Sequence, residues 1–266
     1  IDAIFEVRET FKDVYIELPK EEAYTGKSIK ILGAYGTKAK GFGTSSFSLN
    51  DENVIDAGNL LAGLESNASK IQNIWLTHSH LDHICDIAYV IDNYFDELKQ
   101  SINIHALPET IEAIQKHFLN DLIWPDFSKI KLSNCDEMCI RYTAIELDKE
   151  YKRSDTESIQ AFKTDHTVPS CGYIYKKEQS AVLITADTYS LENIIQIIDN
   201  DISIKSVVIE CSFPSRMEKL AKDSKHLTPV LLAEQLKNLK RTEIDLYINH
   251  IKPLYLEEMS EEIKDC

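Results

Sequence analysis

The sequence has no run of about 18 apolar residues, which is the length that a membrane-spanning helix requires. A membrane protein is therefore not expected. The first ten residues, IDAIFEVRET, contain no start methionine and no basic stretch followed by an apolar one. They do not form an intact secretory signal, so we expect a cytoplasmic protein. A fragment or a processed form would give the same pattern, so an earlier, removed signal stays open.

Basic residues are scarce, with 29 Lys and Arg against 44 Asp and Glu and a formal net charge of −15. Extended contact with a nucleic-acid backbone depends on clustered basic residues that displace counterions, so this class of partner is disfavoured. The charge does not exclude a small anionic substrate at a metal centre, because a bound divalent ion dominates its local field. The expected partner is a small molecule.

The six cysteines form no CxxC pair and no regular framework. We expect reduced thiols that pack as small hydrophobic side chains. Cys135 and Cys139 are close enough in sequence to share a metal ion. Without a second cysteine pair, that interpretation is strongly disfavoured.

Internal repeats and low-complexity linkers are also absent. Residues 1–27 are charged and irregular in pattern, and we leave them unassigned as a linker or the end of an upstream region. Over 28–266, apolar strands are interspersed with helices, which predicts one α+β domain with two mixed sheets flanked by helices. Thr228 is expected to cap a helix that has Pro229 in its first turn.

One helix is predicted over 82–98 from its apolar spacing. Most of its apolar face is expected to come from Ile84, Ile87, Tyr89, Val90, Ile91 and Tyr94.

A cluster of metal-capable side chains follows one predicted strand. In WLTHSHLDH, the residues His78, His80, Asp82 and His83 fall within six positions. Imidazole and carboxylate groups suit zinc and neighbouring divalent metals. One ion could hardly be chelated by all four side chains without strain. The spacing therefore indicates two neighbouring metal sites.

Three more candidate ligands stand at the ends of apolar strands. His166 follows IQAFKTD, Asp187 ends AVLITA and His250 ends DLYIN. A single histidine at a strand end is more often a solvated side chain. Because the ends of several strands can meet at one edge of a sheet, the four positions together make coincidence a poor explanation.

HSHLDH, followed by His166, Asp187 and His250 in that order, resembles the dinuclear metallohydrolases of the metallo-β-lactamase superfamily. The resemblance implies an αββα sandwich with a metal pair at one edge. A narrower resemblance, over about Gly33 to His250, is to the class II 3′,5′-cyclic-nucleotide phosphodiesterases. It is carried by GTSSFSL, VIDAG, LTHSHLDHICDI, HALPETIEAI, NDLIWPDF, ITADT, IECSFP and KHLTPVLLAEQL.

The resemblance implies two divalent ions, most readily zinc, with manganese or iron chemically tolerated. One ion would be held by His78, His80 and His166 and the other by Asp82, His83 and His250, with Asp187 bridging the two. This chain departs from the family pattern in the lysine-rich turn GAYGTKAKGFG and in NLLAG after VIDAG. Neither departure touches a ligand, so they bear on substrate preference rather than on the metal centre.

The expected function is hydrolysis of cyclic AMP or cyclic GMP to the 5′-monophosphate by a hydroxide that bridges two metals. Asp82 would orient this hydroxide and accept its proton. The resemblance implies that Glu210 orients His226 as the general acid for the leaving ribose oxygen. Without the family, a surface carboxylate and a residue next to a helix cap are the simpler interpretations of these two positions.

The stretch NDLIWPDF is too apolar for a simple surface loop. Trp124 and Phe127 are candidates to stack on a nucleobase. The favoured alternative is that they pack beneath a loop or contact a second copy, since the resemblance implies a homodimer. His105 and His117 fall outside the metal set and are expected to be structural or solvated.

Two other functions stay open. A tRNase Z-like RNA endonuclease shares the fold and the motif DHTVPSCGY, but the acidic charge and the lack of a basic RNA-gripping arm oppose it. A non-catalytic cyclic-nucleotide sensor would need neither Glu210 nor His226, so the presence of this pair favours turnover.

Overall fold

The computed structural model describes residues 5–6 and 29–265. Contacts divide the chain into two compact units. The first consists of Ile1–Ser28, Ala34–Phe42 and Leu147–Cys266, and the second of Ile29–Gly33 and Gly43–Glu146. Apart from the short strand β1 (Phe5–Glu6), the N-terminal segment over 1–27 lies outside the described residues. The domain boundary at residue 28 stays a prediction.

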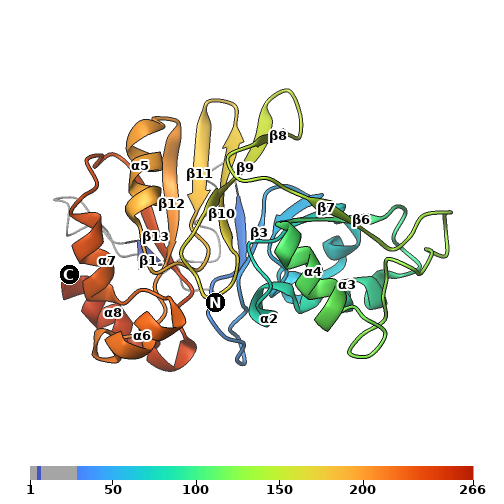
Figure 1. The fold of residues 1–266 in the computed structure, drawn as a ribbon, viewed down its shortest axis with the longest axis horizontal. Helices are drawn as coiled ribbons and strands as arrows, with labels where there is room; N and C mark the ends of the chain where they lie inside the picture. Colours follow the sequence, from blue (N-terminus) through green and yellow to red (C-terminus); the bar gives the residue numbers. More distant parts are fainter. Residues whose placement is uncertain (1–4, 7–28, 266) are drawn as a thin grey trace. The chain divides into compact units, whose positions relative to one another are not determined.

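The first unit contains a seven-stranded sheet in the order β1-β13-β12-β11-β10-β9-β8 (Figure 1). Beside β1, its strands are β8 (Glu150–Lys152), β9 (Glu157–Lys163), β10 (Cys171–Lys177), β11 (Ser180–Ile184), β12 (Ile204–Glu210) and β13 (Asp245–Asn249). β11, β12 and β13 are parallel, and β9 runs in the same direction because it is two antiparallel steps from β11. The chain therefore leaves these four strands at one edge of the sheet.

In the described part of this unit, four helices gather on one side of the sheet in Figure 1. They are α5 (Glu192–Asn200), α6 (Glu218–Ser224), α7 (Pro229–Leu236) and α8 (Leu256–Asp265), with short 3-10 turns at Ser215–Met217 and Pro253–Tyr255. The predicted start of α7 is confirmed. Thr228 caps it, since its Oγ1 accepts a hydrogen bond from the Leu231 N–H at 3.4 Å.

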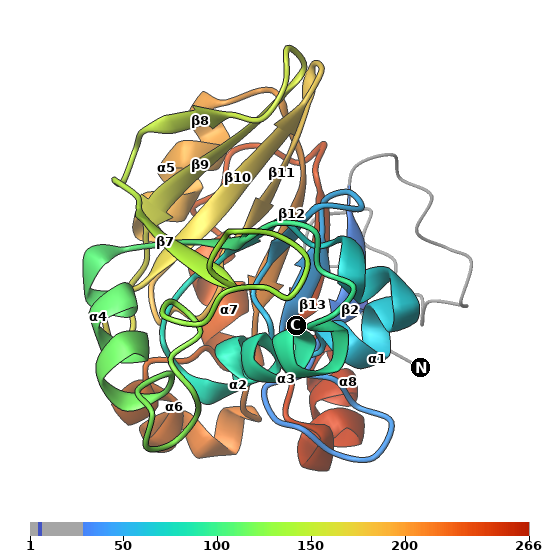
Figure 2. The same ribbon diagram turned by 90° about the vertical axis from the view of Figure 1, so that its right-hand side faces the viewer.

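The second unit contains a six-stranded sheet in the order β2-β3-β4-β5-β6-β7. Figure 2 labels its two edge strands, β2 and β7. The strands are β2 (Lys30–Gly33), β3 (Ser46–Ser48), β4 (Asn53–Ile55), β5 (Asn73–Trp75), β6 (Ile102–Ala106) and β7 (Ile140–Ala144). The last four are parallel. Its helices are α1 (Leu60–Leu64), α2 (Leu81–Ile84), α3 (Asp86–Tyr94) and α4 (Pro108–His117), with a 3-10 helix at Glu65–Lys70.

The helix predicted over 82–98 corresponds to α2 and α3, separated at Cys85. Ile84, Ile87 and Ile91 are buried in the core of the second unit, as expected. The prediction is wrong for Tyr89, which is 44% exposed. At about 100° per residue, Tyr89 falls on the opposite side of the helix from the three isoleucines.

Two mixed sheets flanked by helices confirm the predicted α+β class. β8, α1 and α6 were not anticipated from the sequence. β8 has an exposed Glu150 and Lys152 and therefore lacks an apolar signal. Within the described part of the chain, no helix has both the length and the apolar character that crossing a membrane requires.

Candidate active site

The second unit places the HSHLDH residues at the carboxyl end of β5. His78 is fully buried in the loop after the strand, His80 precedes α2, and Asp82 and His83 lie within α2. The ring of His78 lies 4.6 Å from that of His80 and 4.1 Å from that of His83, measured between centroids. His83 Nε2 lies 3.8 Å from Asp82 Oδ2. The loop therefore gathers its four metal-capable side chains into one cluster.

Asp56 orients this cluster, and the sequence analysis missed its role. It follows β4, the parallel neighbour of β5, and its side chain is 1% exposed. His83 Nδ1 donates to Asp56 Oδ2 at 2.7 Å, and the Thr77 N–H donates to Asp56 Oδ1 at 2.9 Å. Burial raises the pKa of the Asp56 carboxyl, although His83 and Thr77 act in the opposite direction. The signal was available, because Asp56 ends an apolar strand as Asp187 does.

In the first unit, Asp187 lies between two histidines at the shared edge of the parallel strands. His166 Nε2 is 3.7 Å from Asp187 Oδ2, and His250 Nε2 is 3.3 Å from Asp187 Oδ1. The two carboxylate oxygens thus face different imidazoles. This is the arrangement that a carboxylate shared between two metal ions requires.

Protein oxygens contact the Nδ1 atoms of three further candidate ligands. His166 Nδ1 lies 3.2 Å from the Lys225 carbonyl oxygen, and His250 Nδ1 lies 2.8 Å from Ser212 Oγ. His78 Nδ1 lies 3.0 Å from Thr77 Oγ1. Such contacts fix the ring orientation and leave Nε2 as the coordinating nitrogen. The donor set therefore fits divalent metal ions.

Glu210 and His226 form a buried pair beside these ligands in the first unit. His226 Nδ1 lies 3.2 Å from Glu210 Oε1, and the same carboxylate accepts hydrogen bonds from the backbone N–H groups of Leu227 and Thr188 at 3.1 and 3.2 Å. Burial lowers the pKa of His226, but the carboxylates of Glu210 and Asp187 outweigh this effect and the net shift is upward.

His226 is also near the ligand set itself. One ligand atom from each of Asp187, His226 and His250 lies within 4.8 Å of the others. The pair that the sequence assigned to proton transfer is therefore adjacent to two candidate ligands.

The link between α6 and α7 holds His226 in place. Lys225 ends α6 in a left-handed conformation with φ of 59°, and the His226 N–H donates to the Ala221 carbonyl at 2.8 Å. Two residues later, the Thr228 cap begins α7. The backbone of His226 is thus fixed on both sides.

Left-handed backbone conformations recur at the ends of the site strands. Asp56 follows β4 with φ of 56°, Ala186 precedes Asp187 with φ of 53°, and His250 has φ of 67°. Residues other than glycine rarely adopt such angles, although asparagine, aspartate and histidine do so more often than the rest, and each costs of the order of 1 kcal/mol. The turns aim side chains at the sheet edge, and the surrounding fold offsets the strain.

The sequence matches the family described as class-II cAMP phosphodiesterases over residues 32–261. The chain belongs to this family. It is 26% identical over 222 residues to 3′,5′-cyclic-nucleotide phosphodiesterase 1 of Saccharomyces cerevisiae, a match that covers 68% of this chain and 56% of the yeast protein. The matched part thus spans little more than half of that relative.

Solved structures establish the fold of this family member. Unliganded yeast PDE1 superposes with a TM-score of 0.74 at 20% identity, covering 90% of this chain and 93% of the other. The metallo-β-lactamase fold protein YhfI from Bacillus subtilis gives 0.68 at 20% identity, with coverages of 90% and 92%. The short form of human tRNase Z gives 0.63 at 19% identity, with coverages of 86% and 94%. The predicted metallo-β-lactamase fold is confirmed.

The candidate residues for nucleobase stacking differ in their surroundings. Phe127 is 3% exposed and belongs to the hydrophobic core of the second unit, so we propose no substrate contact for it. Trp124 is partly buried, and its ring meets that of Tyr89 edge-on at 5.4 Å. Leu122, two residues earlier, is 88% exposed. A stacking role for Trp124 stays a prediction.

The two histidines left out of the metal set have other surroundings. His105 stacks on Trp75 at 4.0 Å, and its Nε2 lies 3.0 Å from Asn73 Oδ1. His117 is the exposed last residue of α4. These surroundings match the expectation of a structural and a solvated side chain.

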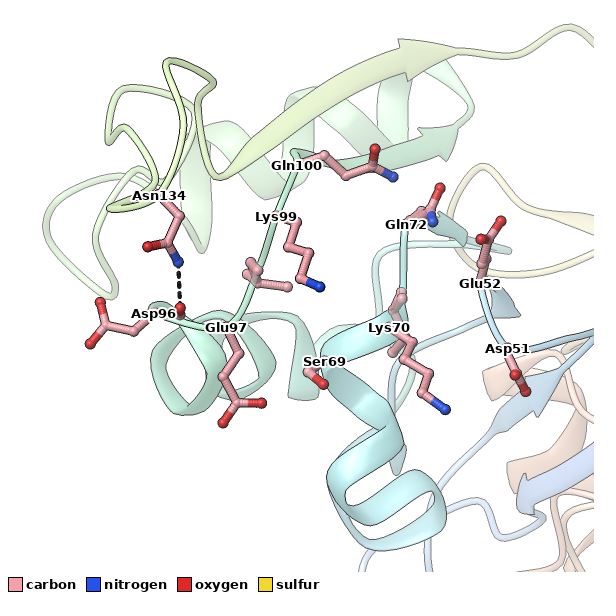
Figure 3. A pocket seen from close by; sticks show the side chains of 12 residues that line it. Asp51, Glu52, Ser69, Lys70, Gln72, Asp96, Glu97, Lys99, Gln100 and Asn134 are labelled. Atoms are coloured by element: carbon pink, nitrogen blue, oxygen red, sulfur yellow. Dashed lines mark hydrogen bonds between the residues drawn. The ribbon is translucent and has the colours of Figure 1, made fainter.

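A pocket of about 890 Å³ lies elsewhere in the second unit (Figure 3). It opens between the segments that precede β4, β5 and β6, at the edge of the sheet opposite to His78. Both acidic and basic side chains line it, including Glu52, Glu97, Lys70 and Lys99. None of the predicted site residues lines this pocket.

Proposed function

We propose that this chain is a metal-dependent phosphodiesterase that hydrolyses 3′,5′-cyclic nucleotides, cyclic AMP or cyclic GMP, to 5′-monophosphates. Membership of the class-II cAMP phosphodiesterase family supports the reaction class. The position of His226 supports the proposal most directly. His226 pairs with Glu210 through Nδ1, and one of its ring nitrogens lies within 4.8 Å of ligand atoms of Asp187 and His250. A proton donor beside metal ligands is what cleavage of a ribose ester needs.

The proposed metal centre holds two divalent ions. His78, His80 and His166 would hold one divalent ion, Asp82, His83 and His250 the second, and Asp187 would bridge the two. The family and the fixed Nδ1 contacts support this assignment, and zinc suits the donor set best, with manganese or iron as alternatives. Two such ions, when bound, lower the pKa of water and neutralise the charge of the phosphodiester.

Asp82 would orient the attacking water and accept its proton. Its position supports this role, because Asp82 lies in the first turn of α2 and is only partly buried, within 3.8 Å of His83 Nε2. The backbone of this segment is firmly placed. The Asp82 carbonyl oxygen approaches Gly58 so closely that a Cβ atom there would lie 2.0 Å from it.

His226 would donate a proton to the leaving ribose oxygen. Glu210 accepts the Nδ1–H of His226, so the other ring nitrogen, Nε2, carries the proton that is transferred. Glu210 is held by Ser212 Oγ at 3.1 Å as well as by the backbone. A pure sensor would not need this pair, which supports turnover rather than binding alone.

The experiment that tests the proposal is a hydrolysis panel with the metal-loaded protein. The substrates are cyclic AMP, cyclic GMP, cyclic pyrimidine nucleotides, a cyclic dinucleotide, an aryl phosphodiester and a precursor tRNA. We expect 5′-monophosphates from the purine cyclic mononucleotides. Intact cyclic nucleotides in the presence of a full complement of metal would overturn the proposal. Cleavage of the tRNA alone would establish the RNA endonuclease instead.

Two variants separate the proposed roles. Asp82→Ala should abolish turnover of all substrates. His226→Ala should slow hydrolysis of cyclic AMP by a factor on the order of 100 to 10,000, and hydrolysis of the aryl diester much less, because an aryl leaving group needs no proton. His117→Ala, at the exposed end of α4, is the matched control and should leave both rates unchanged.

The proposal includes a homodimer and a cytoplasmic location. The exposed side chains of Leu122 (88%) and Ile123 (65%) support self-association through this loop, because apolar side chains of this size gain from burial. Sedimentation velocity of the parent and of the double variant Leu122→Asp, Ile123→Asp tests it. A monomeric parent, or a dimer unaffected by the two substitutions, would contradict it.

A further inference from the structure

Lys252 lies on the segment that leaves His250. Its backbone N–H donates to the Ser212 carbonyl at 3.4 Å. Ser212 Oγ in turn lies 3.2 Å from His226 Nδ1 and 2.8 Å from His250 Nδ1. The Lys252 side chain therefore starts from the loop that positions both histidines.

The ammonium group of Lys252 is fixed without being neutralised. Nζ donates to the Gly36 carbonyl at 2.9 Å and lies 5.1 Å from the centroid of the Phe213 ring. Phe213 is 6% exposed, and its ring is 5.7 Å from that of His226. A carbonyl oxygen and an aromatic face hold a cation in place but leave its full positive charge. Two of the three ammonium N–H donors remain for another acceptor.

Other lysines of this acidic chain pair with carboxylates. Lys225, Lys176 and Lys177 lie 3.1, 2.9 and 3.1 Å from Asp165, Asp201 and Glu157. Within the described part of the chain, no carboxylate oxygen lies within 4.0 Å of Lys252 Nζ. Lys30 is held in a similar way, since its Nζ donates to the Gly63 carbonyl at 3.3 Å, but Lys252 stands two residues after His250, beside the candidate site.

Phe213 links Lys252 to the catalytic pair. The centroid of its ring lies 5.1 Å from Lys252 Nζ and 5.7 Å from the centroid of the His226 ring. The cation therefore stands close to the group that would protonate the leaving oxygen. An anionic phosphate that reaches His226 also comes within the field of Lys252.

We propose that Lys252 is a substrate-binding residue that donates to a non-bridging phosphate oxygen of the cyclic nucleotide and of its 5′-monophosphate product. This inference rests on the proposed function and adds a phosphate contact that is supplied by the protein itself. Lysine suits the role as a compact point charge with several donors.

The test measures binding as well as turnover. The metal-loaded parent, Lys252→Met, Lys252→Arg and the control Lys176→Met are titrated with 5′-AMP, with inorganic phosphate and with adenosine by calorimetry. Lys252→Met should bind 5′-AMP and phosphate about tenfold more weakly, as expected for the loss of one charge-assisted hydrogen bond, and should raise KM for cyclic AMP by a similar factor. Adenosine binding should not change. Lys252→Arg should recover most of the loss, and Lys176→Met should match the parent.

Metal content is measured in every variant, so that a displaced His250 is recognised. Unchanged phosphate and 5′-AMP affinity in a fully metal-loaded Lys252→Met would overturn the inference. Inorganic phosphate binding needs no turnover, so it tests the role of Lys252 even if the protein hydrolyses no cyclic nucleotide. A lack of hydrolysis would refute the proposed function and leave the binding test of Lys252 valid.

Discussion

At the scale of single residues, the site depends on side chains that hold other side chains. Asp56 and Ser212 coordinate nothing in the proposed centre, yet they contact the Nδ1 atoms of His83 and His250. Oriented in this way, each histidine presents Nε2 with little loss of side-chain entropy on metal binding. Supporting contacts of this kind are typical of metal sites and affect affinity strongly.

Asp56→Asn should therefore weaken zinc binding by roughly 10- to 100-fold while preserving the fold, because an amide is a weaker acceptor for the His83 N–H. Competition with a coloured chelator measures the affinity. Asp51→Asn, at an exposed position just before β4, is the matched control and should bind zinc as the parent does. Equal affinity in the two variants would refute the role assigned to Asp56.

Gly36 is needed for the position of His250. A Cβ atom at Gly36 would lie 2.5 Å from the His250 carbonyl oxygen and 2.8 Å from its Nδ1. Gly36→Ala should displace this ligand and reduce turnover by a factor on the order of 100, with loss of bound metal. Metal analysis and kinetics on the same preparation measure both effects.

Gly41→Ala is the control for this substitution. Its Cβ would meet nothing within 4 Å, but Gly41 has φ of 81°. We expect a loss of about 1 kcal/mol in stability with full metal content. If Gly36→Ala also lost only about 1 kcal/mol in stability and kept its full metal content, the close packing of Gly36 against His250 would not be needed for metal binding.

At the scale of elements, strand direction places the site. Asp187, Glu210 and His250 follow or end three neighbouring parallel strands, and His166 follows a fourth strand of the same direction. This convergence was predictable from sequence, since each residue ends an apolar run. The HSHLDH loop was predictable for the same reason.

Other features of the structure have no recognisable pattern in the sequence. The turns at Asp56, Ala186 and His250 are left-handed without glycine, and at Ala186 the residue type gives no sign of this, so the surrounding contacts specify the turn. Gly36 and Lys252 acquire their roles through contacts between segments more than 200 positions apart. The division into two units could not be predicted either, because the first unit is discontinuous in sequence.

Arg241 is another element-scale feature that the sequence did not reveal. Its buried guanidinium donates to the carbonyls of Ile198 and Asp201, at the end of α5, and of Ile204, at the start of β12. It thus ties the helix to the following strand. Positive charge at a helix C-terminus is also favourable.

Arg241→Met should lower the free energy of unfolding by about 3 kcal/mol, because two buried carbonyls and one partly buried carbonyl lose a charged donor. Urea denaturation measures this loss. Lys240→Met, at the exposed neighbouring position, should change stability by less than about 0.5 kcal/mol. Turnover of folded Arg241→Met should equal that of the parent, and a stability within 1 kcal/mol of the parent would contradict the bracing role.

At the scale of the whole molecule, the proposed donors are spread along the sequence from residue 78 to residue 250. One loop provides His78, His80, Asp82 and His83. The ends of separate strands provide His166, Asp187 and His250. The chain has a net charge of −15. An anionic substrate would therefore be attracted by local positive charges, which the proposed metal ions and Lys252 supply.

The most direct measurement is a titration of the metal-free chain with zinc, following conversion of cyclic AMP to 5′-AMP at each step. The account predicts no turnover without metal and a plateau at two ions per chain. His80→Ala, in the second unit, and His166→Ala, in the first, should each prevent the plateau. Turnover by the metal-free chain, or none after two zinc ions have bound, would contradict it.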